Sequence, residues 1–105
     1  MLTLGMENLN VIYEKIRLND KVIPHLKIDI IDEIFIFTYS FKSKAFDKKY
    51  IPVFFSPYQK DLSFLYNLSS EPYICRRIMD KLHGDISFSK ISESEVAFIV
   101  SSKLI

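Results

Sequence analysis

The stretch IFIFTYSF, residues 34–41, places an aromatic side chain at every second position, from Phe35 to Phe41. Because side chains alternate between the two faces of a β-strand, all four rings would point the same way in an extended chain. In a helix the same residues would spread around the circumference and leave no coherent face. The stretch therefore predicts a strand, and its aromatic face must be either buried or used as a contact surface. We expect most of these rings in the core, under covering helices.

The segment before this strand predicts its neighbour. Residues 22–31 are β-branched and apolar, and Pro24 indicates that the strand starts late or lies at an edge. The apolar positions change phase at Asp32 and Glu33, which indicates either a hairpin turn or a β-bulge. Neither residue is glycine, so the pattern leaves both alternatives open.

Further strands and helices are predicted along the rest of the chain. Residues 50–55 predict a third strand, and residues 86–88 and 96–100 predict a closing hairpin. Helical spacing occurs at residues 7–17, 57–68 and 71–83. The first of these could also be a strand, and its apolar i, i+3, i+4, i+7 stripe favours the helix. A capping box at Ser56–Gln59 starts the second helix, and Gly84 is the expected C-terminal cap of the third.

This order of elements predicts an α+β fold. We expect a single small domain over residues 1–105, with residues 1–6 as a possible loose extension. Its mostly antiparallel sheet would have about five strands, with about three helices packed on one face.

Length and composition limit the class of protein. The chain has 105 residues, a net charge of +1 and one cysteine. One globular domain is expected from this length, and the balanced charge gives no general field for nucleic acid or membrane. A single cysteine fits a reducing compartment, and no signal peptide or membrane span is visible. We therefore expect a cytoplasmic protein that does not associate with membranes.

The sequence excludes the common cofactor and metal motifs. Only Gly5 and Gly84 are glycines, so neither glycine-rich nucleotide fingerprint is possible, and one cysteine cannot form a Cys-x-x-Cys pair. No cofactor, metal ligand or catalytic residue is predicted. Cys75 is interpreted as a small buried residue, and His83 as a residue that interacts with the C-terminal end of a helix.

Turns and the basic, aromatic loop 42–50 are the regions most suited to contact with a partner. Acidic residues suit a basic partner surface, and tyrosine suits a partly wet interface. The predicted partner-binding residues are Asp29, Asp32, Glu33, Tyr39, Phe46, Lys48, Lys49, Tyr50, Glu93 and Glu95.

Elimination of motifs leads to a protein-binding function. The main prediction is an inhibitor of a partner protein such as a toxin or effector enzyme, as in bacterial toxin-immunity and antitoxin proteins, and not an enzyme. One alternative is a nucleic-acid-binding accessory protein, in which the rings of loop 42–50 stack on bases while its lysines contact phosphates. Another is a small enzyme with a non-motif active site. A homodimer is also possible, since an exposed edge strand can pair with its own copy.

Overall fold

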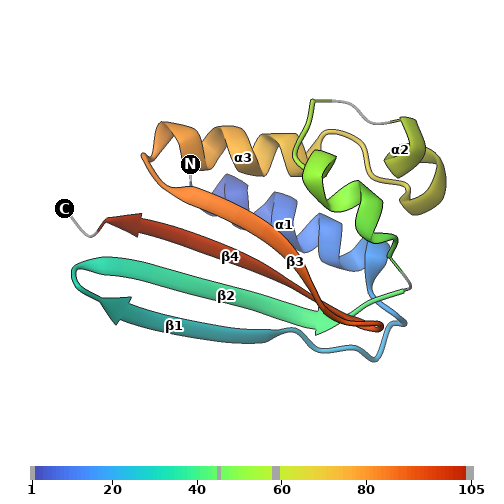
Figure 1. Ribbon diagram of the computed structural model, residues 1–105, viewed down its shortest axis with the longest axis horizontal. Helices are drawn as coiled ribbons and strands as arrows, with labels where there is room; N and C mark the ends of the chain where they lie inside the picture. The colour runs from blue at the N-terminus through green and yellow to red at the C-terminus, as the bar shows by residue number, and fades with distance from the viewer. Residues whose placement is uncertain (1, 45, 58–59, 104–105) are drawn as a thin grey trace.

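The computed structural model describes residues 2–44, 46–57 and 60–103. These residues form a single antiparallel sheet with helices on one face (Figure 1). The four strands in these residues follow the order β1-β2-β4-β3. In chain order the elements are α1 (Leu2–Ile16), β1 (His25–Ile31), β2 (Ile34–Lys42), the 3-10 helix η1 (Lys48–Val53), α2 (Lys60–Tyr66), α3 (Glu71–Lys81), β3 (Asp85–Ser92) and β4 (Glu95–Lys103). Helices α1 and α3 lie lengthwise over one face of the sheet, while η1 and α2 lie beside one end of it (Figure 1).

The predicted α+β class is confirmed, with one strand fewer than expected. Residues 50–55 do not form a strand, because most of them belong to η1. The side chain of Asp47 accepts a hydrogen bond from the backbone N–H of Lys49 and starts this helix, and Pro52 cannot donate to a strand ladder. Helix α2 begins at Lys60, and the predicted capping box lies partly outside the described residues. Helix α1 begins at Leu2, so it includes most of the segment 1–6 that the sequence predicts as a possible loose extension.

A two-residue turn joins β1 to β2 and explains the phase change in the sequence. Asp32 and Glu33 have φ angles of 51° and 65°, and Ile31 pairs with Ile34 in the register of the hairpin. Two successive left-handed residues are the signature of a primed turn, whose twist matches that of the flanking strands. The turn alternative is therefore the right one, although the sequence offers no glycine for it.

The aromatic ladder on β2 is buried at one end only. Tyr39 and Phe41 are 4% and 1% exposed, whereas Phe35 and Phe37 are half-buried. The ring of Tyr13 on α1 makes edge-on contacts with the first two, at centroid distances of 6.2 Å and 5.0 Å. The ladder thus forms the core where α1 covers it and stays accessible towards the β1–β2 turn.

A second aromatic cluster fixes η1 and α2 to the sheet. Phe54 stacks on Phe88 at 4.1 Å, and Phe46 stacks on Tyr66 at 4.4 Å. Phe98 of β4 contacts Phe54 and Phe88 and joins this cluster to the ladder. The high aromatic content is therefore used to pack an irregular segment against the sheet.

Three rings that were expected at a surface belong to these clusters. Tyr39, Phe46 and Tyr50 are between 1% and 8% exposed, so the prediction that they lie on a contact surface is wrong. Full burial of a large aromatic ring stabilises the fold more than partial exposure does, and α1 and η1 both pack over these rings.

The end of α3 differs in detail from the prediction. His83, with φ of 56°, is the left-handed residue, and its N–H donates to the carbonyl of Asp80 at 3.2 Å. The N–H of Gly84 donates to the carbonyl of Met79 at 2.8 Å. This pair of bonds is a Schellman motif, in which the left-handed position precedes Gly84. Gly84 therefore takes part in the C-terminal cap, whereas the positive φ angle belongs to His83.

An ion pair between α1 and α3 makes stability depend on pH. Lys15 Nζ lies 2.5 Å from Glu71 Oε1, and the N–H of Ser69 donates to the other carboxylate oxygen. Burial alone would raise the pKa of Glu71, but these two hydrogen bonds, the carboxylate's hydrogen bond with its own backbone and the charge of Lys15 lower it overall. A carboxylate with a lowered pKa stabilises the fold above its unfolded pKa, and this contribution is lost as the pH falls.

We expect Lys15→Met to remove about 1 kcal/mol of unfolding free energy at pH 7, and distinctly less at pH 3. Urea unfolding at both pH values measures the difference. Lys49→Met is the control, because Lys49 is largely exposed in its pair with Asp47 and should have little effect. Equal losses at pH 7 and pH 3 for Lys15→Met would contradict the role assigned to Glu71.

Candidate ligand-binding site

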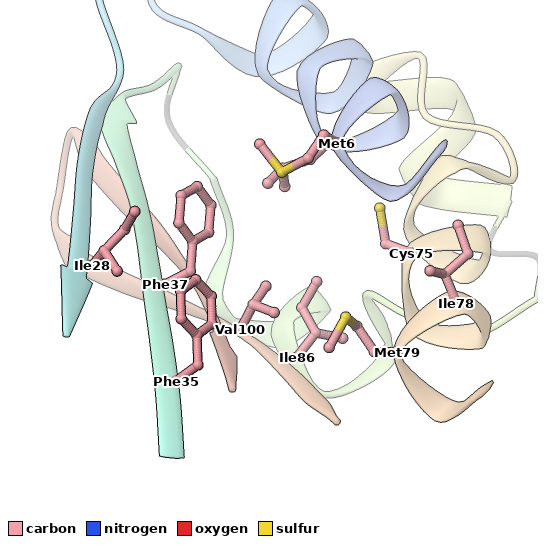
Figure 2. A pocket seen from close by; sticks show the side chains of 10 residues that line it. Met6, Ile28, Phe35, Phe37, Cys75, Ile78, Met79, Ile86 and Val100 are labelled. Carbon is pink, nitrogen blue, oxygen red and sulfur yellow. The ribbon is translucent and has the colours of Figure 1, made fainter. Parts of the chain in front are cut away.

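A cavity of about 200 Å³ lies between the sheet and the two long helices. Figure 2 shows Phe35 and Phe37 on β2 facing Met6, Cys75 and Met79 on the helices across this space. The lining is completed from α1, α3 and the other three strands. The full set is Met6, Leu9, Ile28, Phe35, Phe37, Cys75, Ile78, Met79, Ile86 and Val100.

The cavity exists because the helices fill the space over only one end of the ladder. Tyr13 of α1 is buried over Tyr39 and Phe41, whereas small or flexible side chains such as Cys75 and Met79 face the other end. Met6 and Ile28 are 37% and 60% exposed, so the mouth of the cavity lies between the start of α1 and β1.

The chemistry of the lining is almost entirely apolar. No Asp, Glu, Lys, Arg or His is among the described residues that line the cavity. The thiol of Cys75 is its most polar side-chain group, and burial, reinforced by the charge of Glu71, raises the pKa of this thiol to about 12. The thiol is therefore protonated at neutral pH, as the interpretation of Cys75 as a small buried residue implies, and is a poor nucleophile. Such a lining can bind and orient an apolar group, but it holds no general acid or base.

A second, more open hollow of about 540 Å³ lies at the other end of β1. It is lined by the loop after α1 and by polar side chains including His25, Lys42 and Glu95. The side chains of His25 and Lys42 are exposed, so packing does not hold them in one geometry. This hollow offers less pre-organisation for a ligand than the apolar cavity does.

The acidic residues predicted for partner binding do not form one surface. Asp32 and Glu33 lie in the β1–β2 turn, whereas Glu93 and Glu95 lie at the β3–β4 turn. In the register of the sheet Glu95 is opposite Lys42, and Ile34 is opposite Lys103, so the two turns are at opposite ends. Asp29 lies on β1 beside Lys27, at 3.6 Å.

The basic loop 42–50 is also different from the prediction. Lys48 and Lys49 are exposed, but Phe41, Phe46 and Tyr50 point into the core. Lys49 Nζ lies 5.1 Å from the ring centroid of Tyr50, which is already packed. The rings are therefore not available to stack on nucleic-acid bases.

Motif analysis missed the cavity because it is assembled from all four strands and two helices. One signal was present in the sequence. A strand rises more per residue than a helix, so the ladder on residues 35–41 extends further in space than the helical stripe on residues 9–16 that covers it. Over the described residues, no group of three or more His, Cys, Asp or Glu side chains could hold a metal ion. Within the same residues, no helix is long and apolar enough to span a membrane.

Comparison with known proteins identifies the fold. No protein-family model and no curated protein matches the chain. Among solved structures, two nucleotide-free forms of the catalytic domain of histidine kinase ThkA have TM-scores of 0.73 and 0.74, with 14% and 16% sequence identity. The match covers 96% of this chain and 63% or 66% of those chains. The mycobacterial sensor histidine kinase MprB has a TM-score of 0.66 at 8% identity, and 95% of its chain is covered.

These likenesses correct the predicted function. The domain has the fold of histidine kinase catalytic domains, and the prediction of a toxin-immunity or antitoxin inhibitor is wrong. The prediction that the chain is not an enzyme is contradicted by the same finding, because catalytic domains of enzymes have this fold. At 14–16% identity the likeness establishes the fold, and this chain spans about two thirds of the length of the ThkA chains.

Proposed function

We propose that this domain binds a small ligand through an uncharged, ring-sized apolar group, which occupies the cavity between β2 and helices α1 and α3. The observation that carries the proposal is the cavity itself, which is lined on one side by two half-buried aromatic rings. Its volume of about 200 Å³ exceeds the roughly 150 Å³ of an engineered apolar cavity that accepts benzene. The single cysteine is consistent with the cytoplasmic location that we also propose.

Two kinds of molecule offer such a ring. The first is the purine base of a nucleotide, since the ThkA domains are described as nucleotide-free forms. The second is a neutral aromatic compound. A nucleotide fits the cavity by its base alone: the lining described above has no cation for a triphosphate, and the chain has only two glycines. Phosphate groups would have to remain outside the mouth.

Thermal unfolding with three probes tests this proposal. We expect indole and adenosine to raise the melting temperature of the protein, by about 5 °C or more at ten times the dissociation constant. Cys75→Leu places a larger side chain in the cavity and should abolish the shift, whereas Cys75→Ala leaves the space open and should retain it. ATP is the third probe, and binding through the ring alone predicts a shift no larger than that given by adenosine.

Three outcomes would overturn the apolar site. One is the absence of any shift with all three probes in the wild-type protein. A second is an equal shift in wild type and Cys75→Leu, because the ligand would then bind elsewhere. Loss of binding in Cys75→Ala but not in Cys75→Leu would assign the effect to the thiol and also contradict the proposal.

The fold favours a second candidate, a small enzyme that uses a nucleotide. The likeness extends over 96% of the chain, so it includes every described element. This candidate predicts that ATP binds more tightly than adenosine and that the protein releases phosphate or transfers it to an acceptor. Measurement of ATP affinity against adenosine affinity, together with release of labelled phosphate, separates it from the ring-binding proposal.

A further inference from the structure

Strand β1 leaves one edge of the sheet uncovered (Figure 1). Its register against β2 is regular from His25 to Ile31, with no bulge. Three of its apolar side chains, Leu26, Ile28 and Ile30, are 58%, 60% and 63% exposed. A regular, apolar and uncovered edge strand is a template for pairing with another strand.

The backbone of the same three residues faces the outer edge. Ile31 and Ile34 close a two-residue primed turn, so they exchange hydrogen bonds with each other. Hydrogen-bonding directions alternate along a strand, and the N–H and C=O groups of Leu26, Ile28 and Ile30 therefore point away from β2. These residues thus present apolar side chains and backbone donors and acceptors at one edge.

The opposite edge of the sheet is protected. The register between β3 and β4 shifts between Lys90 and Ser92, which makes this edge irregular. Arg76 Nη1 also donates to the carbonyl of Ile86 at 3.2 Å and occupies part of the edge. Bulges and covering side chains of this kind are how proteins prevent strand pairing, and β1 has neither.

We propose that β1 pairs antiparallel with β1 of a second copy, about a two-fold axis at Ile28. In this register Ile28 is opposite its own copy, and Leu26 is opposite Ile30. Lys27 is then opposite Asp29 of the other chain, so both cross-strand pairs on the polar face are attractive. Shifting the register by two residues in either direction would place Lys27 opposite Lys27, or Asp29 opposite Asp29. The charges therefore select one register, and the sheet becomes continuous through a symmetric dimer.

Charge exchange tests the proposed register. Sedimentation equilibrium of the wild type should show a dimer, and Lys27→Asp or Asp29→Lys alone should weaken it about tenfold or more, because each places like charges opposite one another twice. The double variant Lys27→Asp/Asp29→Lys should restore dimerisation to nearly the wild-type level. A monomeric wild type, or a double variant as weak as the single ones, would overturn the proposal.

Cross-linking tests the position of the axis. In a Cys75→Ala background, Ile28→Cys places two thiols on directly opposed residues, about 5.5 Å apart at Cα and within the range for a disulfide. Mild oxidation should therefore give a linked dimer in high yield. Lys27→Cys in the same background should link poorly, because its opposite residue is Asp29. A higher yield for Lys27→Cys than for Ile28→Cys would exclude this register.

Discussion

Replacing Phe98 with alanine is expected to lower the free energy of unfolding by about 3–5 kcal/mol. Phe98 is 0% exposed and lies at the junction of the two aromatic clusters. Its ring is 4.7 Å from that of Phe88, 5.7 Å from that of Phe54 and 6.4 Å from that of Phe41. Truncation would leave a cavity between the sheet and η1 and remove contacts from both clusters. Urea or guanidinium unfolding, followed by circular dichroism, measures the loss.

The next residue in the same strand provides a matched control. Ile99 points to the other face of β4 and is 38% exposed, so Ile99→Ala should cost about 1 kcal/mol or less. The two variants share a strand and a loss of apolar side-chain area, and they differ in the face of the sheet from which that area is removed. Equal costs for the two substitutions would contradict the assignment of the core to the ladder face.

Regular elements were predictable from the sequence because short-range patterns determine them. Alternation at residues 34–41 requires a strand for its rings to share a face, and helical spacing at residues 71–81 requires a helix for its apolar residues to do so. The exception is η1, where aromatic and β-branched residues resemble a strand. There the hydrogen bond from Lys49 N–H to Asp47 and the contacts of Phe54 with Phe88 outweigh local propensity.

The candidate site could not be derived in the same way. Its lining comes from six elements, and a cavity is the difference between the volume that a fold encloses and the volume that its side chains fill. The local sequence around Phe35 or Cys75 does not express that difference, and the one signal in the sequence is the greater length of the ladder relative to the helical stripe that covers it. The function was argued from missing motifs, and missing motifs do not identify a fold, which is why the inhibitor prediction failed.

The connection between α3 and β3 contains Gly84, whose substitution is expected to give the second large loss of stability. A Cβ atom at Gly84 would lie 2.6 Å from the carbonyl oxygen of Ser101 and 2.4 Å from Cε of Met79. Methionine can rotate away, but the carbonyl belongs to the backbone of β4 and is held by the β3–β4 ladder. We therefore expect Gly84→Ala to lower the free energy of unfolding by about 1–3 kcal/mol, as overpacking does in a filled core. Thermal or urea unfolding measures this.

A substitution at the neighbouring residue, His83, tests why Gly84→Ala is destabilising. The cause is either the close approach of other atoms to Gly84 or the backbone conformation at this position. If the glycine were needed for a left-handed angle, His83, which has that angle, would be the sensitive position. His83→Gly should instead leave stability unchanged or raise it by up to about 1 kcal/mol, because glycine adopts a positive φ angle without strain. Destabilisation by His83→Gly together with a neutral Gly84→Ala would contradict the assignment of the left-handed cap. The expected result, in contrast, would assign the role of Gly84 to the limited space between α3 and β4, beside the side chain of Met79 that also lines the candidate site.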